Sequence, residues 1–470
     1  MTRMDCDLRQ LPVLVDDRMD RVILRSPDRE WTAGDLLASA GALSDRLHAQ
    51  REKPRYLINL ASRRDDFLVG LLAGMLGGQT NLMPASRTPG AINDLLDQYP
   101  DTVLLHGHDD TIDPRIANHR PQVAIPPLQE GLGANVAAPM PRIPADAIVA
   151  RVFTSGSTGT PSGHDKTWGR LNDNARAAAQ ALDTLASPTA EPLQVLGTVP
   201  SQHMYGFESL ILATLCEGAV LSSEQPFFPT DIANALARLP APRVLVTTPY
   251  HLHHLLASGI ELPRCERILC ATAPLDPILA RRAESTLGGV LQEIYGCTET
   301  GQIAVRRPTR DGSWSLMPGI ELRHEGDDTI AQDGHIETPT RLGDRIAPLA
   351  ERRFELLGRQ GNQVNIAGKR SSIEFLNAKL RSIDGVVEGL FFDPGADNDS
   401  TMRLAAVVCA PGLTVDQVRD SLRAEIDPVF LPRPLLLVGR LPVNATGKVT
   451  RETLLRLLED EPVSTQAEAS

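Results

Sequence analysis

Aromatic residues are scarce in this sequence, since Phe, Trp and Tyr together make up 4% of its 470 residues. The core must therefore be built mainly from aliphatic and alanine side chains. No apolar run approaches the roughly 20 residues that a membrane-spanning helix needs, so we expect no membrane segment and no membrane partner. The first residues, Met1 to Leu11, lack the apolar stretch of a signal peptide, which favours a cytoplasmic protein.

Paired cysteines and clustered metal ligands are also missing. The six cysteines are scattered, with no C-x-x-C pair and no Cys/His spacing that suits zinc. We interpret them as reduced thiols of a cytosolic protein. His106 to Asp110 is interpreted as a polar turn, and His251, His253 and His254 do not share a helix face well enough to bind a metal.

Positive charge is in deficit, with a formal net charge of −12. Nucleic-acid-binding proteins favour a basic face, so the composition argues against nucleic acid as a partner. A small anionic ligand in a local site stays compatible with this charge. The length of 470 residues is too great for one ordinary core and predicts two or more domains.

Short apolar strands alternate with amphipathic helices along most of the chain, which is typical of an α/β fold with a largely parallel sheet. Asp113 to Pro144 is rich in Pro, Gly and Ala and is predicted to be a surface connection. The predicted strands are 22–24, 56–60, 103–105, 148–153, 195–199, 243–247, 267–271 and 290–294, and the predicted helices are 31–47, 67–76, 170–182 and 208–216.

The pattern changes to short strands and turns after about Gly301, and Gly358 to Asn362 is a strong local breaker. We therefore predict a large N-terminal α/β domain with mixed sheets over residues 1–358 and a smaller, mobile α+β domain over 359–470. Helices 372–381 and 415–425 and strands 364–366, 387–392 and 403–408 build the second domain. The polar tail after about residue 460 is expected to be disordered.

One stretch, Phe153 to Gly163, combines glycines with several hydroxyl side chains directly after an apolar strand. Its hydroxyl and free backbone N–H groups can wrap phosphate oxygens. No Gly-Lys-Ser or Gly-Lys-Thr follows, so it is not the common phosphate loop. Taken alone, a Ser/Thr/Gly stretch of this kind is more often a solvated turn.

Four further motifs follow in the chain, and each has an ordinary structural interpretation. Tyr295 can be a strand-end aromatic, Glu299 an acid at a helix start, Asp344 a turn cap and Lys448 a solvated lysine. The motifs are Pro200 to Phe207, Tyr295 to Thr300, Arg341 to Asp344 with Gly358-Arg359, and Leu441 to Arg451 with Gly447-Lys448.

In this order, the five motifs resemble the adenylate-forming superfamily, which includes acyl-CoA and aryl-CoA ligases, carrier-protein ligases, peptide-synthetase adenylation domains and beetle luciferases. The resemblance runs from roughly Trp31 to Arg451. It implies that a carboxylate attacks the α-phosphate of ATP to give an acyl-adenylate and pyrophosphate, and that a thiol then displaces AMP. Because two anions must meet, electrostatic stabilisation should dominate.

The resemblance also implies residue roles. Lys448 reaches from the small domain to the reacting groups, Thr298 touches the α-phosphate, His203 is the third catalytic residue, and Glu299 binds Mg²⁺. Tyr295 lies against the adenine opposite Ala273-Pro274, and Asp344 with Arg359 holds the ribose. The implied nucleotide-binding residues are Thr154, Ser155, Gly156, Ser157, Thr158, Gly159, Ala273, Pro274, Tyr295, Gly296, Thr298, Asp344, Arg359 and Lys448.

Three departures from the family pattern concern charge and flexibility. Ser162 stands where the loop usually has Lys, with Lys166 as the nearest cation, and Gly361 replaces the hinge acid or lysine. Asn365 replaces a Lys before Gly368. A nucleotide-binding homologue with impaired chemistry therefore remains an alternative, although the retained Glu299 and Lys448 argue against it.

The segment Pro200 to Phe207 and the compact length resemble aryl-acid ligases of bacterial aryl-polyene and xanthomonadin pigment clusters. This implies a flat hydroxybenzoate- or hydroxycinnamate-like acid, with a fatty acid as the alternative. The phosphopantetheine thiol of an acyl carrier protein is the favoured acceptor, and free coenzyme A is the alternative; Arg352, Arg353, Lys369 and Arg370 are candidate cations for either. The expected substrate-binding residues are His203, Tyr205, Gly206, Phe207, Gly296 and Cys297.

Overall fold

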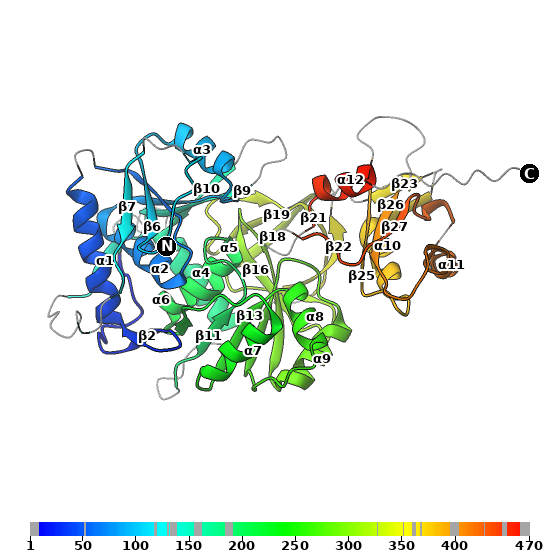
Figure 1. The fold of residues 1–470 in the computed structure, drawn as a ribbon, viewed down its shortest axis with the longest axis horizontal. Coiled ribbons are helices and arrows are strands. Elements are labelled where there is room, and N and C mark those ends of the chain that lie inside the picture. Colours follow the sequence, from blue (N-terminus) through cyan, green and yellow to red (C-terminus); the bar gives the residue numbers. More distant parts are fainter. Residues whose placement is uncertain are drawn as a thin grey trace, which may run out of the picture. The chain divides into compact units, whose positions relative to one another are not determined.

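The structure is a computed structural model, and it divides into two compact units (Figure 1). Unit 1 comprises Met1–Arg341 and Pro348–Glu355, and unit 2 comprises Leu342–Ala347 and Leu356–Ser470. Leu342–Ala347 therefore groups with unit 2, whereas the sequence interpretation assigned it to the first domain. The described residues are 9–50, 53–116, 120–128, 131, 139–154, 162–183, 191–326, 328–350, 352–359, 363–366, 369–394, 404–426, 428–443 and 449–460.

The first sheet of unit 1 is mostly parallel and has six strands within the described residues. The antiparallel strand β10 at its edge pairs with β9 and brings Ser162 opposite Thr154. Helix α2 (Arg64–Gly77) is buried along nearly its whole length, and its residues from Phe67 onward, FLVGLLAGMLG, are apolar on all sides. The strand order is β10 (Ser162–Thr167), β9 (Ile148–Thr154), β5 (Thr80–Met83), β4 (Tyr56–Asn59), β6 (Thr102–Gly107) and β7 (Gln122–Ile125).

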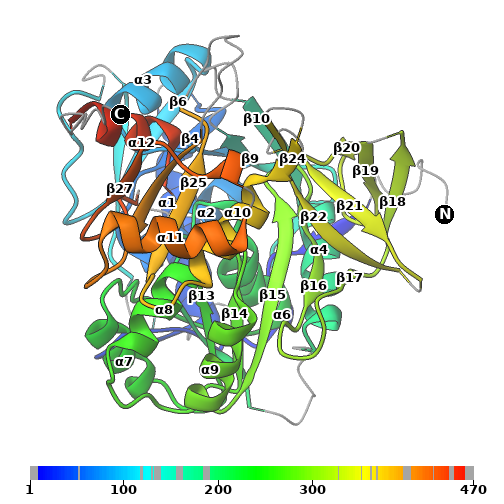
Figure 2. The ribbon, with the colours of Figure 1, turned by 90° about the vertical axis from the view of Figure 1, so that its right-hand side faces the viewer.

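The second sheet has eleven strands in the described part of the chain, and its centre is parallel. Figure 2 shows β13, β14, β15 and β16 side by side. The order is β21 (Asp344–Pro348), β22 (Arg353–Arg359), β17 (Trp314–Leu316), β16 (Gly301–Arg306), β15 (Val290–Cys297), β14 (Arg267–Cys270), β13 (Arg243–Thr247), β11 (Gln194–Gly197), β12 (Val220–Ser222), β2 (Val22–Arg25) and β3 (Glu30–Thr32).

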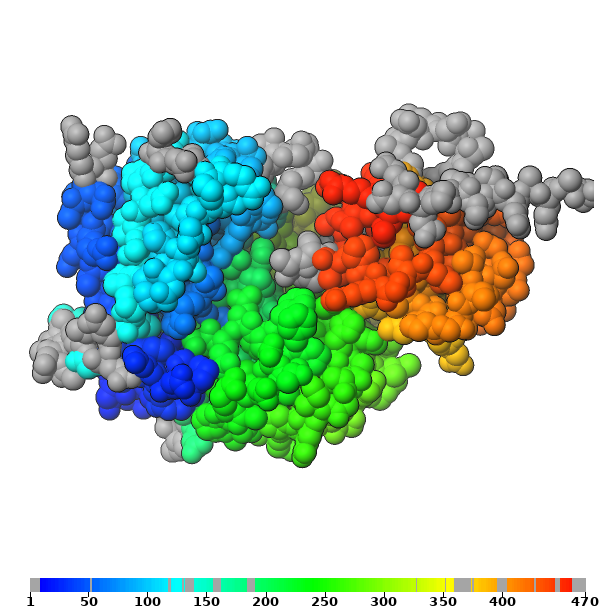
Figure 3. All heavy atoms as spheres, in the orientation of Figure 1, coloured from blue at the N-terminus to red at the C-terminus, as the bar shows by residue number. Residues whose placement is uncertain are grey.

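Both faces of these central strands are covered, as parallel strands require. On one face Leu196, Leu245 and Ile268 pack with helices α7 (Pro229–Arg238), α8 (Pro249–Ala257) and α9 (Pro277–Leu287). Figure 3 shows the green residues of this helical layer as a continuous part of the surface. The opposite face lies toward α4 (Trp168–Ala181) and α6 (Ala213–Glu217), which contact each other.

Unit 2 is a small α+β unit built on the sheet β25 (Glu388–Phe392), β26 (Ala405–Cys409) and β27 (Leu435–Leu437). Alternate residues of β26 face opposite sides. Ala406 and Val408 pack with α10 (Ile373–Arg381) and α11 (Val415–Glu425), whereas Ala405 and Val407 pack with α12 (Arg451–Asp460). The short pair β23 (Gln363–Ile366) and β24 (Lys369–Ser372) completes the unit among the described residues.

The expected fold class, a mixed-sheet α/β domain followed by a small α+β domain, is confirmed, but three local predictions are wrong. The segment from Asp113 to Pro144 is not only a connection, because β7 pairs with β6, and β8 (Arg142–Pro144) pairs with β1 (Gln10–Pro12). Both strands are short, four and three residues long, and lie in a stretch rich in Pro, Gly and Ala, so no periodic pattern marks them. Strand β15 does not end at Ile294 but continues to Cys297.

The third correction concerns the predicted helix Glu208 to Cys216. It begins earlier, with α5 (Met204–Gly206), and continues through the π-helical segment Phe207–Leu212 into α6. Gly206 permits this start, since a Cβ there would lie 2.0 Å from the carbonyl oxygen of Pro200. Such π-helical turns are frequent at functional sites.

The described helices include none that is both long and apolar enough to cross a membrane. The predicted disordered tail lies outside the described residues, as do residues 155–161 of the phosphate-loop candidate, Gly361 and the 444–448 segment that contains Lys448.

Candidate active site

The motifs of unit 1 meet at one edge of the second sheet. Parallel strands β11, β13, β14 and β15 run in register, so their carboxyl ends lie together. The turn that leads to His203 follows β11, the Ala273-Pro274 turn follows β14, and Tyr295 to Cys297 ends β15. Ligands of open α/β sheets bind outside the carboxyl ends of the strands, so this edge is the candidate site.

Tyr205 ties the His203 motif to this edge. Its hydroxyl contacts the carbonyl oxygens of Thr247 at 3.1 Å and Leu269 at 2.9 Å. Burial raises the pKa of Tyr205 well above its ordinary value, so the phenol stays neutral. The hydroxyl of Tyr205 is therefore engaged by backbone, and Phe207 is buried at 1% exposure. The half-buried His203 precedes α5 with an extended backbone.

The end of β15 leaves its backbone open to close approach by a ligand. The Tyr295 ring is held by Trp314, with centroids 5.5 Å apart, and by Phe354, with centroids 5.9 Å apart. The register against β16 shifts between Tyr295 and Gly296, and a Cβ on Gly296 would lie 2.1 Å from the carbonyl oxygen of Gly301. This bulge leaves Gly296 and Cys297 exposed at the end of the strand.

The turn after β14 also presents unusual backbone. Thr272 has a positive φ of 83°, a conformation that costs energy for a β-branched residue. It stands directly before Ala273 and Pro274, and all three are exposed. The predicted adenine platform thus follows a strained position at the same sheet edge.

Glu299 lies beside the end of the candidate phosphate loop. Its Oε1 is 3.7 Å from His164 Nε2, and that nitrogen is 3.4 Å from Thr154 Oγ1. Burial alone would raise the pKa of Glu299, but hydrogen bonding with Cys297 and with backbone, and the charges of His164 and Lys166, hold the pKa below its ordinary value. The carboxylate is therefore ionised at neutral pH.

This carboxylate fits Mg²⁺, which takes oxygen ligands and often binds one or two carboxylates together with substrate phosphates. The Glu299 side chain is 36% exposed and so remains accessible. The described residues contain no group of three or more His, Cys, Asp or Glu side chains arranged for a metal. A magnesium ion at Glu299 would therefore be shared with phosphate oxygens.

Lys166 has a position that sequence analysis did not foresee. It is 5% exposed, and its Nζ donates a hydrogen bond of 2.9 Å to the carbonyl oxygen of Glu299. Burial lowers the pKa of Lys166, while nearby Glu208, Cys297, Glu337 and Glu299 act in the opposite direction. The nearest cation to the loop thus holds the turn that carries Glu299.

Glu208 forms a buried network under the same turn. Its Oε1 accepts hydrogen bonds from Asn174 Nδ2 at 2.8 Å and from the Gln302 backbone N–H at 3.1 Å. Burial raises the pKa of Glu208 to about 7, although Lys166 opposes this. A Cβ on Gly301, whose φ is +73°, would lie 2.4 Å from Glu208 Oε1. Polar residues inside apolar segments are the only sequence signal for this network.

Arg64 anchors the start of the His203 turn from helix α2. Its guanidinium is 2% exposed and donates to Ser201 Oγ at 3.1 Å. It also donates to the carbonyl oxygens of Gly197, Val199, Ser222 and Glu224. Burial lowers the pKa of Arg64 to about 10, so the group stays charged. The cation binds the ends of β11 and β12 together.

The remaining predicted residues stay predictions. Thr298 is half-buried in the turn between β15 and β16. Asp344 is the first residue of β21, half-buried and grouped with unit 2, and Arg359 is the last residue of β22.

Comparison with known proteins shows the family to which the chain belongs. Residues 14–326 match the model of the AMP-binding enzyme family. The chain is 28% identical over 295 residues to a 4-coumarate–CoA ligase of Rhodobacter capsulatus, covering 63% of this chain and 73% of that protein. It is 23% identical over 316 residues to a 3,4-dihydroxybenzoate–[aryl-carrier protein] ligase of Bacillus anthracis, covering 64% and 72%.

Solved structures show the same fold. The o-succinylbenzoate coenzyme A synthetase of Bacillus subtilis, in complex with ATP and magnesium, superimposes with a TM-score of 0.78 at 18% identity, covering 95% of this chain and 100% of that one. The protein belongs to the AMP-binding enzyme family. It is an AMP-forming acid–thiol ligase.

Proposed function

We propose that this ligase uses ATP and Mg²⁺ to activate an aromatic carboxylic acid and transfers the acyl group to the phosphopantetheine thiol of an acyl carrier protein. The main supporting observation is the ionised Glu299 carboxylate, held beside Thr154 and His164 and next to the exposed Gly296-Cys297 backbone. A carboxylate there has the chemistry to neutralise phosphate charge through Mg²⁺.

The first half-reaction joins an acid oxygen to the α-phosphorus of ATP and releases pyrophosphate. Thr154, Ser155, Gly156, Ser157, Thr158 and Gly159 hold the β- and γ-phosphates, and Thr298 holds the α-phosphate. Lys448 offsets the charge that develops as two anions meet. In the second half-reaction the thiol attacks the acyl carbon and AMP leaves, which forms the thioester.

An aromatic acid is supported by the names of two relatives, since one acts on 4-coumarate and the other on 3,4-dihydroxybenzoate. The proposal also assigns the ring of Tyr205, whose hydroxyl is bound at the ends of β13 and β14, to the wall of the acid pocket. The finer resemblance to aryl-polyene and xanthomonadin ligases belongs to the same proposal. A fatty acid remains the competing substrate class.

The choice between a carrier protein and coenzyme A as the acceptor depends on different observations. One relative loads an aryl carrier protein and the other uses coenzyme A, so relatives favour neither acceptor alone. Two of the four candidate cations are already engaged: Arg352 donates to carbonyl oxygens of Met317 and Ile320, and Arg353 pairs with Asp311. The proposal assigns recognition of an acidic carrier to Lys369 and Arg370, whose positive charges are complementary to acidic helix residues.

Pyrophosphate exchange across a panel of carboxylic acids tests the proposed function. We expect exchange with hydroxybenzoates or hydroxycinnamates at low concentration and weak exchange with octanoate. Exchange with fatty acids alone would replace the aromatic proposal. Exchange with no acid at all would favour the impaired homologue.

A further inference from the structure

The sequence of the candidate phosphate loop contains no positively charged side chain. Thr154 to Gly163 includes neither lysine nor arginine, and Ser162 stands where the family resemblance expects a lysine. The β- and γ-phosphates of ATP are strongly anionic, and hydrogen bonds to them are strongest from charged or well-aligned N–H donors. A donor close to the loop would therefore compensate for the missing lysine.

One face of strand β10 lies toward the turn that carries Glu299. Alternate residues of a strand point to the same face, so Ser162, His164 and Lys166 share one face of β10. Lys166 Nζ donates to the Glu299 carbonyl oxygen at 2.9 Å, and His164 Nε2 lies 3.7 Å from Glu299 Oε1. The face that begins at Ser162 therefore leads to the proposed magnesium ligand.

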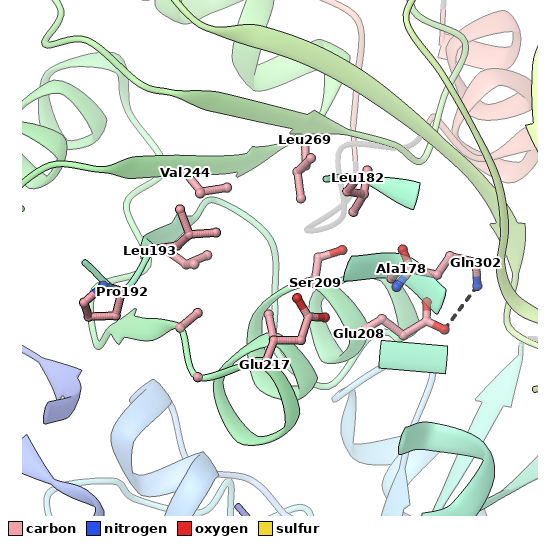
Figure 4. Close-up of a pocket in the computed structure, with 14 residues that line it drawn as sticks. Ala178, Leu182, Pro192, Leu193, Glu208, Ser209, Glu217, Val244, Leu269 and Gln302 are labelled. Atoms are coloured by element: carbon pink, nitrogen blue, oxygen red, sulfur yellow. Dashed lines mark hydrogen bonds between the residues drawn. The ribbon is translucent and has the colours of Figure 1, made fainter. Parts of the chain in front are cut away.

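The turn that carries Glu299 is held in place by other residues than His164. Lys166 is 5% exposed and is bound to the backbone of this turn. Glu208 lies under the same turn and accepts a hydrogen bond from the backbone N–H of Gln302 (Figure 4). Lys166 is therefore occupied as a support, and His164 is available for a different role.

His164 brings a ring nitrogen close to both groups that the proposed function assigns to the phosphates. Its Nε2 is 3.4 Å from Thr154 Oγ1 and 3.7 Å from Glu299 Oε1, and its side chain is 23% exposed. Both distances exceed the roughly 2.7–3.2 Å of a good N–H···O hydrogen bond, so both contacts are weak. A phosphate bound by Thr154, and by Glu299 through Mg²⁺, comes within reach of Nε2.

We propose that His164 binds the β- and γ-phosphates of ATP, and hence pyrophosphate, in place of the loop lysine. Its Nε2 donates a hydrogen bond to a non-bridging phosphate oxygen, which replaces the weak contact with Thr154. A neutral ring with its proton on Nε2 is sufficient, so binding requires no change of protonation. The inference rests on the proposed function and adds the side chain that compensates for Ser162.

Equilibrium binding of ATP, pyrophosphate and AMP to the full chain tests this role, because AMP lacks the two phosphates that His164 would bind. We expect His164→Ala to raise the Kd for ATP and for pyrophosphate by roughly tenfold or more, the size of one hydrogen bond to a charged group. The Kd for AMP should stay unchanged. His164→Gln keeps an N–H donor and should retain part of the ATP affinity.

A second substitution tests whether His164 replaces the lysine. Ser162→Lys, introduced together with His164→Ala, should restore most of the ATP affinity, because residue 162 lies on the same face of β10 and the new side chain supplies a cation. Unchanged weak ATP binding in the double variant would contradict the replacement.

His324→Ala is the matched control. His324 lies on another strand of unit 1, β18 (Ile320–Glu325), and its Nδ1 is also close to a threonine hydroxyl, 3.2 Å from Thr329 Oγ1. Its loss should leave all three Kd values unchanged. Thermal unfolding of every variant shows whether weaker binding reflects loss of folding.

The outcomes separate this inference from the proposed function. Equal losses of ATP and AMP affinity in folded His164→Ala would overturn the inference, because they would show a structural role of the ring. A loss that saturating Mg²⁺ removes would also overturn it and would assign His164 to the positioning of Glu299. In both cases pyrophosphate exchange with aromatic acids by the unmodified protein would leave the proposed function standing. An unmodified protein that binds no ATP would remove both proposals.

Discussion

Three charged side chains determine the electrostatics of the candidate site. Glu299 is ionised and accessible, Lys166 is buried against its backbone, and Glu208 is buried with a raised pKa. Each side chain is held by partners from other elements, and Lys166 lies close enough to both acids to affect their pKa values.

Lys448 should act in the transition state. We expect Lys448→Ala to reduce pyrophosphate exchange by about 10²–10³-fold while the Kd for ATP changes little, because a cation that meets developing charge affects turnover more than ground-state binding. Exchange kinetics and equilibrium dialysis measure the two quantities. Near-normal exchange would remove Lys448 from the catalytic residues.

Lys166 should position Glu299. Replacement by Met removes the hydrogen bond to the Glu299 carbonyl, and loss of such a supporting contact typically costs about 10–100-fold in metal affinity or activity. We therefore expect Lys166→Met to raise the Mg²⁺ concentration needed for half-maximal exchange, and Lys166→Arg to restore part of it.

Lys379→Met provides the control for Lys166, since Lys379 makes an exposed ion pair with Glu425 in unit 2. An unchanged Mg²⁺ requirement in Lys166→Met, with only a lower melting temperature, would show a structural role alone.

At the scale of elements, buried polar groups join helices to strand ends. Arg64 links α2 to the ends of β11 and β12, and Glu208 links the π-helical segment to α4 and β16. These contacts set the turn that carries His203 and the turn that carries Glu299.

Removing the Arg64 guanidinium leaves several buried carbonyl oxygens without a donor. We expect Arg64→Met to lower the free energy of unfolding by about 2–4 kcal/mol and to raise the KM for the acid more than the KM for ATP. Urea titration and exchange kinetics provide both values. Arg456→Met, which removes an ion pair with Glu452 that is exposed on both sides, should do neither.

Glu208 makes stability depend on pH. Its folded pKa of about 7 exceeds its ordinary value of 4.5, so the folded state binds the proton more tightly than the unfolded state. Stability is therefore greatest below about pH 4.5 for this group and decreases as the pH rises through about 7, by up to about 3 kcal/mol. Nearby Lys166 opposes the effect.

Glu208→Gln keeps an oxygen that accepts from Asn174 and Gln302 but has no charge to bury. We expect the variant to lose this pH dependence and to gain stability over the unmodified protein at pH 8, but not at pH 5. Denaturation at both pH values measures the difference. Parallel pH profiles of the two proteins would contradict the role of Glu208.

At the scale of the whole molecule, the two half-reactions should separate. If Lys369 and Arg370 attract an acidic carrier protein, Lys369→Glu combined with Arg370→Glu should slow carrier loading at least tenfold and leave pyrophosphate exchange largely intact. The loading defect should shrink in high salt, which screens charges over about 10 Å or less.

Coenzyme A provides the competing acceptor in the same assay. Efficient thioester formation with coenzyme A and none with any carrier would contradict the carrier proposal. Equal losses in carrier loading and pyrophosphate exchange would contradict the proposal that Lys369 and Arg370 attract the carrier. That result would not decide between a carrier protein and coenzyme A as the acceptor.

Much of the fold was predictable because local sequence patterns mark its strands and helices. Apolar runs such as Arg243 to Thr247 and the periodic helix Val415 to Glu425 were placed with the correct bounds. Strands β7 and β8 were missed because they are only four and three residues long and lie in a stretch rich in Pro, Gly and Ala. The end of β15 was missed because its last residues, Gly296 and Cys297, do not have strand composition.

The sequence alone determined the α/β class, the order of the motifs and the family, since strand–turn–helix alternation and motif spacing are properties of the linear chain. Tertiary structure decided which groups meet. Lys166 reaches a carbonyl 133 positions away, and Gln302 meets Asn174 at 128 positions. Such contacts arise only when distant segments pack together, so the position of His164 beside Glu299 was visible only in the fold.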